Sequence, residues 1–366
     1  MKIAMFTDYY LPTFGGVQSS IKAQKEALET LGHQVFIYSP IHRVDGDKTI
    51  VRLPTFKFFK PDGYPVAGPA KQVIASAMRE VRSRGIDVIH VHTDMAAGVA
   101  GLTVAKELGI PAVQTMHGRE DVFANKVPFA GLVSAVIAGL HSRYIPHDGI
   151  AIAPGENLAR SGTARRMWRL MVSHANFADH VIVPSRHFAD KLQHFGVNRP
   201  LSIVSNGIEA SALEQLEPIR PRSYKLGQPL KIMWCGRISP EKRPIQFLKA
   251  IKAVGENVQV DMYGDGSQLG RLKRFIWENQ LQNMVTLHGS VDQAAVLREM
   301  TKHDLLAYTS FDFDNQPMVL LEAVATGLPV VYCDSDLSEA IPAEGSLLTN
   351  GPGPEAIAQG VQSLID

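Results

Sequence analysis

The hydrophobic positions of this chain alternate between short continuous runs and longer helical patterns. The strand-like runs of the first half are KIAMFT, QVFIYSP, IDVIHVH, PAVQTMH and DHVIVPS. Between most of them, apolar residues recur at helical spacing, as Val17, Ile21 and Leu28 do before Gly32. Because the strand-like runs are continuous rather than alternating, we expect them to be buried on both faces, as in a parallel sheet covered by helices.

The pattern breaks between residues 205 and 230, where a proline-rich and charged stretch predicts a linker. Alternation then restarts with KIMWCG at 231–236 and continues through VQVDMYG, VTLHGS, DLLAYTS and PVVYCD. We therefore predict an α/β chain of two Rossmann-like, doubly wound domains, residues 1–198 and 199–366, that face a central cleft. Ligands of such sheets bind at the carboxyl ends of the strands.

Composition narrows the class of protein only slightly. Of the 366 residues, 45% are apolar and 20% are charged, which is typical of a globular chain with a normal core. The two cysteines, Cys235 and Cys333, make neither a disulfide framework nor a metal cluster, so a reducing cytoplasm is the expected compartment. The chain opens on a strand without signal-peptide organisation, and it ends in mid-helix by pattern, which is consistent with a clipped C-terminus.

The longest apolar stretch is VPFAGLVSAVIAGL, residues 127–140. A helix needs about 20 residues to cross a bilayer. This stretch is too short to span one, and it predicts either a core helix or a helix that lies at an interface.

Charge is divided unevenly along the chain. Residues 1–198 hold 22 Lys and Arg against 16 Asp and Glu, a balance of +6, whereas residues 199–366 hold 15 against 20, a balance of −5. The division is either chance or a basic first half that faces an anionic partner. Residues 160–174 suit a helix on an anionic membrane, and equally a helix packed by its apolar side with solvated arginines. The candidate membrane or acceptor residues there are Arg160, Arg165, Arg166, Trp168 and Arg169.

Two strand ends carry candidate phosphate-binding groups. Gly15 and Gly16 precede a helix, where glycine amides can approach a phosphate, although by themselves they are weak evidence and are explained more simply by a tight turn. In the second half, Arg237 and Lys242 follow the strand KIMWCG. A guanidinium fork and an ammonium at a strand end suit a diphosphate, whereas such charges elsewhere are usually solvated.

Several motifs that would identify other enzyme classes are missing from the sequence. No G-x-G-x-x-G follows the first strand, and Asp265 between Gly264 and Gly266 does not fit that fingerprint, which counts against a nicotinamide or flavin enzyme. No G-x-x-x-x-G-K-[ST] loop is present, which counts against a nucleotide hydrolase. His90 and His92 alternate along a strand and are expected to face opposite sides, so we expect no metal site.

The stretch SFDFDNQPMVLLEAVATGLPVVYCD, residues 310–334, joins an acidic loop to an apolar helix. If the helix begins near Pro317, the amides of Met318 and Val319 are unpaired at its positive end and can hold a phosphate. Glu322 lies one turn further, where a carboxylate can accept two hydroxyls of a ribose diol, or can merely stabilise the helix start. Asp314, in the loop before the helix, can reach the hydroxyls of a sugar.

These residues resemble a known family, the retaining, nucleotide-sugar-dependent glycosyltransferases of GT-B architecture. The resemblance covers nearly the whole chain, because FTDYYLPTFGGV, HVHT, QTMHG, VIVPS, SNGIE, GRISPEK, YGDGS and DNQPMVLLEAVATGLPVV occur in family order. The first residues are most similar to those of bacterial diacylglycerol glucosyltransferases. Asp314 departs from the family, which usually has glutamate there, and NQP and SDLSEA replace the glycines that usually follow the two motifs.

The resemblance implies a role for each matching position. The catalytic group would be His117, which touches the transferred sugar, together with Arg237, Lys242 and Asp314. The donor would be held by Gly15, Gly16, Arg237, Lys242, Gly264, Asp265, Gly289, Met318, Val319 and Glu322. Of these, Gly16 would offer its amide to the donor phosphate, and Glu322 would bind the ribose.

The resemblance also implies the reaction. A hexose, glucose or a related sugar, would pass from a nucleoside-diphosphate donor, expected to be the UDP sugar, to a hydroxyl acceptor with retained configuration, without metal or cofactor. The expected acceptor is a membrane glycolipid or cell-envelope glycan, reached from the cytoplasm or from the inner face of the plasma membrane, and no nucleic acid is expected as a partner. Two alternatives remain open: a nucleotide-sugar epimerase of the same architecture, and a non-catalytic sugar-nucleotide-binding subunit.

Overall fold

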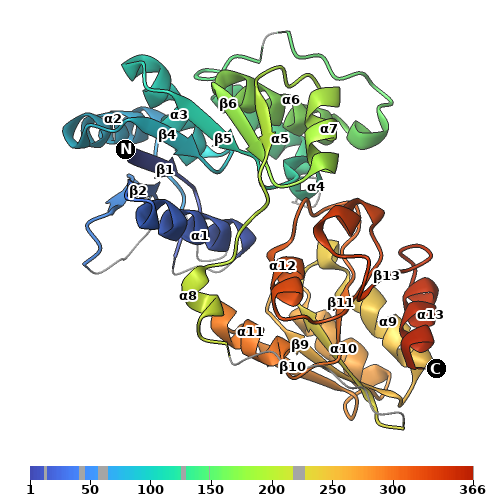
Figure 1. Cartoon of the computed structure of the whole chain (residues 1–366). Helices are drawn as coiled ribbons and strands as arrows, with labels where there is room; N and C mark the ends of the chain where they lie inside the picture. Colours follow the sequence, from blue (N-terminus) through green and yellow to red (C-terminus); the bar gives the residue numbers. More distant parts are fainter. Residues whose placement is uncertain are drawn as a thin grey trace. The chain divides into compact units, whose positions relative to one another are not determined.

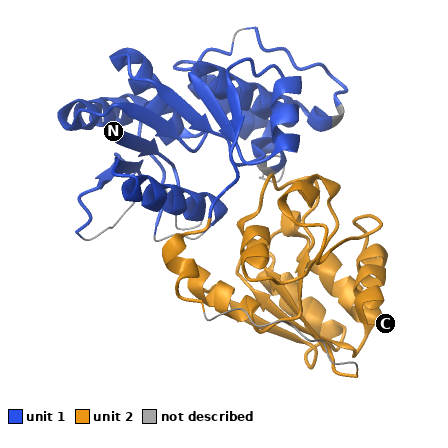
Figure 2. Ribbon diagram, viewed as in Figure 1, with its two compact units in different colours: residues 1–207 blue, residues 208–366 orange. Residues whose placement is uncertain are grey.

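A computed structural model describes residues 1–11, 15–40, 46–56, 65–124, 129–147, 149–216 and 227–365. The chain divides into two compact units, Met1–Gly207 and Ile208–Asp366 (Figures 1 and 2). Residues 217–226 of the expected linker lie outside the described residues, as do residues 12–14 of the first strand-to-helix loop.

The first unit is built on a seven-stranded parallel sheet of order β3-β2-β1-β4-β5-β6-β7 (Figure 1). Its strands are β1 (Lys2–Phe6), β2 (Gln34–Ser39), β3 (Ile50–Arg52), β4 (Val88–Val91), β5 (Ala112–Thr115), β6 (His180–Val183) and β7 (Leu201–Ile203). Its helices are α1 (Gly16–Thr30), α2 (Ala70–Arg84), α3 (Ala96–Leu108), α4 (Glu120–Ala124), α5 (Ala130–His141), η2 (Asn157–Ala159), α6 (Gly162–Phe177) and α7 (Arg186–His194).

Helices cover both faces of this sheet. Ala4 and Phe6 of β1 pack with residues of α2 and α3, whereas Ile3 and Met5 pack with Ile21 of α1. Successive side chains of a strand point to opposite faces, so a strand between two helical layers must be apolar at every position. The continuous apolar run IAMF, residues 3–6 of β1, is the sequence signature of that arrangement.

The second unit repeats the plan with a six-stranded parallel sheet of order β10-β9-β8-β11-β12-β13. Its strands are β8 (Leu230–Cys235), β9 (Val258–Tyr263), β10 (Val285–Gly289), β11 (Leu305–Tyr308), β12 (Val330–Tyr332) and β13 (Ser346–Leu348). Its helices are α8 (Ala210–Leu213), η3 (Pro240–Lys242), α9 (Pro244–Val254), α10 (Leu269–Glu278), α11 (Gln293–Met300), α12 (Met318–Ala325), η4 (Ser335–Ala340) and α13 (Pro354–Ile365).

Alternate residues of β8 define the two apolar layers of the second unit. Ile232 and Trp234 pack with residues of α9, α10 and α13. Met233 packs on the other face, with residues of α11 and α12. The helices α9 and α12 follow β8 and β11 directly, so the loops that lead into them lie at the carboxyl edge of the sheet.

The division between the units falls after residue 207 rather than after residue 198, where the sequence suggested it. The cause is β7, a three-residue strand that pairs with β6 through the register Val181↔Leu201, Ile182↔Ser202 and Val183↔Ile203. A strand this short has no periodicity of its own, so the sequence pattern assigned it to the second half. Hydrogen bonding to β6 makes it the edge strand of the first sheet.

Candidate functional site

The second unit has its topological switch point between β8 and β11. These neighbouring strands are parallel, and from them the chain builds the sheet outward in opposite directions, to β9 and β10 on one side and to β12 and β13 on the other. The loops that leave such a pair diverge to opposite faces and leave a crevice at the carboxyl edge, where ligands of α/β sheets bind. The β8 loop carries Arg237 and Lys242, and the β11 loop carries Asp314.

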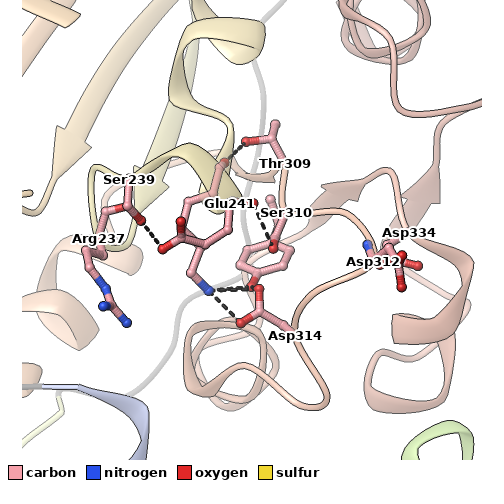
Figure 3. A network of polar contacts seen from close by, with 10 residues as sticks. Arg237, Ser239, Glu241, Thr309, Ser310, Asp312, Asp314 and Asp334 are labelled. Atoms are coloured by element: carbon pink, nitrogen blue, oxygen red, sulfur yellow. Dashed lines mark hydrogen bonds and ion pairs between the residues drawn. The ribbon is translucent and has the colours of Figure 1, made fainter. Parts of the chain in front are cut away.

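Lys242 and Asp314 meet at this edge, and Figure 3 shows Asp314 in the network of polar contacts there. The Lys242 Nζ lies 2.6 Å from Oδ1 and 2.8 Å from Oδ2 of Asp314, so the ammonium engages both carboxylate oxygens. The hydroxyl of Tyr308 lies 3.2 Å from the Lys242 Nζ and donates a short hydrogen bond to Asp314 Oδ2. The three side chains form one ionic and hydrogen-bonded cluster, which we call the Lys242 cluster.

Electrostatics fix the charges of the Lys242 cluster. Burial by itself would raise the pKa of Asp314, but the Lys242 ammonium and the hydroxyls of Ser310 and Tyr308 outweigh it and hold the pKa below its usual value. Burial and the Asp314 carboxylate raise the pKa of Tyr308 well above its usual value. At neutral pH the cluster therefore contains a carboxylate and a neutral phenol that donates its proton.

Side-chain hydrogen bonds hold the two loops of the site together (Figure 3). The Thr309 hydroxyl donates to the backbone oxygen of Lys242 at 2.9 Å, and the Ser310 hydroxyl donates to the backbone oxygen of Glu241 at 3.3 Å. The Ser239 hydroxyl donates a short hydrogen bond to Oε1 of Glu241, whose side chain is buried in the same loop. These contacts fix the backbone from which Lys242 extends.

The other two cations of the β8 loop differ from Lys242. Arg237 is exposed, and in Figure 3 its guanidinium lies apart from Asp314. Arg243 has different partners from Lys242: its Nη2 donates to the Pro352 carbonyl at 2.6 Å, and its Nη1 lies 3.7 Å from Cys333 Sγ. Lys242 and Arg237 thus remain the candidate diphosphate ligands, while Arg243 anchors the loop.

The glycines that end β9 and β10 allow close backbone contact. A Cβ on Gly264 would lie 1.9 Å from the Gly236 carbonyl oxygen, and its φ of +137° also disfavours any other residue. The amide of Gly264 donates to the Gly289 carbonyl at 2.7 Å. Asp265 is exposed and accepts the amide of Gly266 at 2.6 Å. The loops after β8, β9 and β10 therefore pack backbone to backbone at the same edge as Lys242.

Helix α12 begins at Met318, with Pro317 as its N-cap. The structure thus confirms the helix start expected from the sequence, and the amides of Met318 and Val319 lie in its first turn. Glu322 is buried and accepts a hydrogen bond of 2.8 Å from Gln293 Nε2, the first residue of α11. Burial raises the pKa of Glu322, and the Gln293 amide counters only part of that effect.

The switch point of the first unit lies between β1 and β4. Gly15 and Gly16 are exposed at the start of α1, with Gly15 as N-cap in an extended conformation. This is an ordinary helix N-terminus whose first amides have no intrahelical partner. Asp8, which follows β1, accepts the Thr93 hydroxyl at 2.6 Å and so ties the β1 loop to the β4 loop.

His117 follows β5, and its Nε2 lies 3.1 Å from Nδ1 of His92. Burial lowers the pKa of His117 to about 4, so its imidazole is neutral at physiological pH. The rings of His90 and His92 lie 4.0 Å apart, which shows that our expectation of opposite sides was wrong. Positions i and i+2 of a strand share one face. Within the described residues, no group of three or more His, Cys, Asp and Glu could hold a metal ion.

Helix α6 does not present its apolar side to a surface. Met167, Trp168, Leu170 and Met171 are fully buried, and Trp168 Nε1 donates to the Leu158 carbonyl at 3.1 Å. Of the two interpretations of residues 160–174, the packed helix is correct, and Trp168 cannot contact a membrane. The arginines stand differently: Arg160 is exposed, and Arg165, Arg166 and Arg169 are partly exposed. No helix among the described residues is both long and apolar enough to cross a membrane.

Tyr308, Asp94 and Glu120 are three polar residues of these sites that were not among the candidates named from the sequence. Burial raises the pKa of Glu120 to about 7 and that of Asp94 well above its usual value. Tyr308 and Asp94 could have been found, because they lie at or just after strand ends, where ligands of parallel sheets bind. Glu120 could not have been found in this way, since only its burial in the folded chain raises its pKa.

Two family models together match almost the entire chain. The model of Glycosyltransferase Family 4 matches residues 14–212, and the model of Glycosyl transferases group 1 matches residues 217–366. The first model alone spans more than half of the chain, and the border between the two models falls close to the division between the structural units.

Curated relatives match along most of their length at low identity. Alpha-monoglucosyldiacylglycerol synthase of Streptococcus pneumoniae is 26% identical over 90% of this chain and 70% of its own. The enzyme of the same name from Acholeplasma laidlawii is 23% identical over 94% of this chain and 83% of its own. GDP-mannose-dependent alpha-mannosyltransferase of Mycobacterium tuberculosis is 24% identical over 92% of this chain and 79% of its own.

Solved structures of similar fold cover the whole chain. HepE from Anabaena, in complex with UDP and glucose, superposes with a TM-score of 0.69 at 16% identity and covers 100% of this chain and 90% of its own. Sucrose-phosphate synthase from Thermosynechococcus elongatus gives a TM-score of 0.70 at 17% identity, with 100% and 89% covered. The two-unit parallel-sheet architecture expected from the sequence is thus confirmed as one that solved proteins share.

Proposed function

The chain belongs to Glycosyltransferase Family 4 and has the GT-B fold, and on this premise we propose that it is a retaining, metal-independent hexosyltransferase. As a glycosyltransferase it moves a sugar from a nucleotide-sugar donor. The observation that carries the proposal is the Lys242 cluster, because it holds a partly buried ammonium at the switch point of the second unit, where a donor diphosphate would bind.

In the proposed complex, positive groups of the second unit bind the donor diphosphate. Lys242 supplies a point charge, Arg237 supplies an exposed guanidinium fork on the same loop, and the first-turn amides of α12 supply hydrogen-bond donors. Fixed charges of this kind can stabilise the charge that grows on a leaving diphosphate, which is the task that a metal ion performs elsewhere. This is the physical basis for proposing metal independence.

Glu322 is the proposed ligand of the ribose. Its carboxylate is buried in α12, one turn beyond the amides of Met318 and Val319, and Gln293 already occupies one oxygen. A buried carboxylate costs free energy unless it accepts hydrogen bonds, and the raised pKa of Glu322 shows that Gln293 alone does not offset that cost. Two ribose hydroxyls would supply the remaining donors.

The reaction we propose breaks the bond between the sugar C1 and the diphosphate oxygen. The acceptor oxygen forms the new bond to C1 on the same face, and the acceptor proton passes to the leaving phosphate, so no protein base is needed. Asp314 and His117 would contact the transferred sugar. His117 would do so as a neutral imidazole, because its pKa of about 4 leaves it uncharged.

For the acceptor we propose a membrane glycolipid, with a cell-envelope glycan as the wider class, and for the donor UDP-glucose or a related sugar nucleotide. The support is the similarity to two alpha-monoglucosyldiacylglycerol synthases and the fold shared with HepE, whose structures contain UDP, UDP-glucose or glucose. Because two other relatives are named GDP-mannose-dependent alpha-mannosyltransferases, GDP-mannose is also a donor to be tested. An acceptor of this kind would require at least peripheral contact with the membrane.

A calorimetric panel of UDP-glucose, GDP-mannose and ADP-glucose, followed by transfer assays with glycolipid acceptors, tests the proposal. We expect one sugar nucleotide to bind and its hexose to appear on the lipid with retained configuration, also in the presence of EDTA. A donor converted to an isomer without any acceptor would identify an epimerase, and binding without turnover would identify a non-catalytic subunit. Either result would overturn the proposed transferase.

A further inference from the structure

Helix α5 has its polar side buried and its apolar side exposed. Ser134 and His141, seven residues apart on one side, are the buried residues of this helix. On the other side Leu132, Val136 and Leu140 are 67%, 52% and 51% exposed, and Phe129, directly before the helix, is 82% exposed. A surface helix normally turns its apolar stripe to the core. The reversed orientation of α5 leaves a continuous apolar surface uncovered.

The buried side of α5 is fixed against α6, which lies next to it (Figure 1). Arg166 of α6 donates from Nε to the Ser134 hydroxyl at 3.0 Å and from Nη2 to the Gly131 carbonyl at 3.0 Å. The rings of His141 and His174 lie 5.4 Å apart at the other end of the helix. Polar contacts thus set the rotation of α5, so the exposure of its leucines follows from specific bonds rather than from loose packing.

Cations lie at both ends of α5. Residues 129–144, FAGLVSAVIAGLHSRY, contain no Asp or Glu. Arg166 is bonded to the first turn of α5, and Arg143 is exposed just after its last residue. Arg165 and Arg160 continue the cationic side, joined by a hydrogen bond of 3.3 Å from Arg165 Nη1 to the Arg160 carbonyl. Apolar side chains between cations fit the boundary between acyl chains and anionic headgroups.

We propose that α5 inserts its exposed side, Phe129, Leu132, Val136 and Leu140, into the interface of an anionic lipid membrane. A helix of 12 residues is about 18 Å long, so α5 would lie in the plane of the interface. The sequence allowed membrane contact as one of two interpretations of residues 160–174, and it allowed the apolar stretch 127–140 to lie at an interface; the proposal assigns the contact to α5. It deepens the proposed function by naming the surface on which a glycolipid acceptor would be met. It rests on the proposed function only for the identity of the acceptor, and the membrane contact of α5 is tested independently of it.

A lipid surface fits α5 better than a second copy of the chain does. Two copies joined through α5 would bring the same arginines together, and residues 129–144 offer no carboxylate to neutralise them. Anionic headgroups provide that neutralisation at each arginine. We therefore commit to the membrane as the occupant and make self-association an outcome of the test.

The test is co-sedimentation of the full chain with vesicles of phosphatidylcholine alone or mixed equally with phosphatidylglycerol. We expect binding to the anionic vesicles, weakened about tenfold between low and high salt because the arginine contribution is screened. The double variant Leu132→Glu/Leu140→Glu should weaken partition into the vesicles by about 100-fold or more, since two leucines that would be buried in the membrane are lost. Leu31→Glu is the matched control, because Leu31 is 72% exposed at the C-cap of α1, and it should bind as the wild type does.

A second readout does not depend on sedimentation. Phe129→Trp places an indole at the start of α5, and its emission should shift to the blue with anionic vesicles and be quenched by brominated acyl chains. Absence of wild-type binding, or equal binding by the double variant, overturns the proposal, as does a dimer that the double variant abolishes without any vesicle binding. Sugar-nucleotide affinity is measured on the same samples, so loss of vesicle binding with intact donor binding leaves the transferase proposal standing.

Discussion

Replacing Lys242 by methionine should destabilise the second unit, because it leaves the partly buried Asp314 without its cation. The side chains of Lys242 and Asp314 are 15% and 14% exposed, and two contacts of 2.6 and 2.8 Å join them. In the variant the carboxylate keeps the hydroxyls of Tyr308 and Ser310 and loses the ammonium. Removing one partner of a fully buried ion pair typically costs about 3–5 kcal/mol. Because this pair keeps some exposure to water, we expect a loss of about 3 kcal/mol, at the lower end of that range, in the free energy of unfolding.

The double variant Lys242→Met/Asp314→Asn separates the cost of an orphaned charge from the value of the pair. With both charges removed and the shapes preserved, the buried carboxylate no longer needs compensation, and replacement of a whole pair is often nearly neutral. We expect the double variant to recover most of the loss, with a coupling energy of about 2–4 kcal/mol. Asp314→Asn alone should cost less than Lys242→Met, because the long lysine stem can carry its ammonium toward water.

Urea unfolding followed by tryptophan fluorescence measures this cycle. Trp234 is buried in the second unit, and its Nε1 donates to the Thr309 hydroxyl at 3.1 Å, next to the loop that carries Asp314. The chain also holds Trp168 and Trp277, so the cycle is measured in a Trp168→Phe/Trp277→Phe background, in which the emission reports the unfolding of the unit in which the pair lies. If Lys242→Met is no less stable than the double variant, the pair is not coupled as described. The stable double variant is also the proper protein in which to measure the loss of diphosphate affinity.

Three further substitutions test single features of the two units. Glu322→Gln removes a carboxylate whose pKa burial has raised, so the chain should become no less stable at pH 8 while calorimetry shows donor affinity weakened about 10- to 100-fold. Gly264→Ala places a Cβ 1.9 Å from a backbone oxygen and should lower the stability of the unit by more than about 2 kcal/mol in thermal unfolding, whereas Gly270→Ala, with nothing within 4 Å, should be neutral or slightly stabilising. Burial raises the pKa of Glu120 to about 7. Its contribution to the free energy of unfolding is therefore greatest below the unfolded pKa and is lost as pH rises from about 4.5 to about 7. In Glu120→Gln this pH-dependent decrease, up to about 3 kcal/mol, should be absent from urea titrations across the range.

The architecture could be predicted from the sequence because burial on both faces leaves a direct trace. The buried positions of a central strand must be apolar on both faces, and runs such as IAMF and LLAY satisfy this rule. The short edge strands β3 and β7, of three residues each, leave no such trace. Their place is decided by hydrogen bonding to a neighbour far along the chain, which is why the border between the units was set too early.

The site could be predicted only in part, for a related reason. Strand ends are visible in the sequence, so Lys242 and Asp314 were identified as candidates for ligand binding. Their contact was not, because it depends on β8 and β11 being neighbours although 72 residues separate Lys242 from Asp314. The orientation of a helix is equally hidden, since hydropathy alone did not reveal that α6 buries its Trp168 while α5 exposes its leucines.

The Lys242 cluster also bears on how donor binding would proceed. A diphosphate that engages Lys242 competes with Asp314, so binding exchanges one anion for another and releases the carboxylate. Released Asp314 is buried and needs new donors, which sugar hydroxyls supply and a bare nucleoside diphosphate does not. The wild type should therefore favour the sugar nucleotide over the product diphosphate. Asp314→Asn removes the competing charge and should tighten binding of the bare diphosphate about tenfold in calorimetry, while equal affinities before and after the substitution would contradict the exchange.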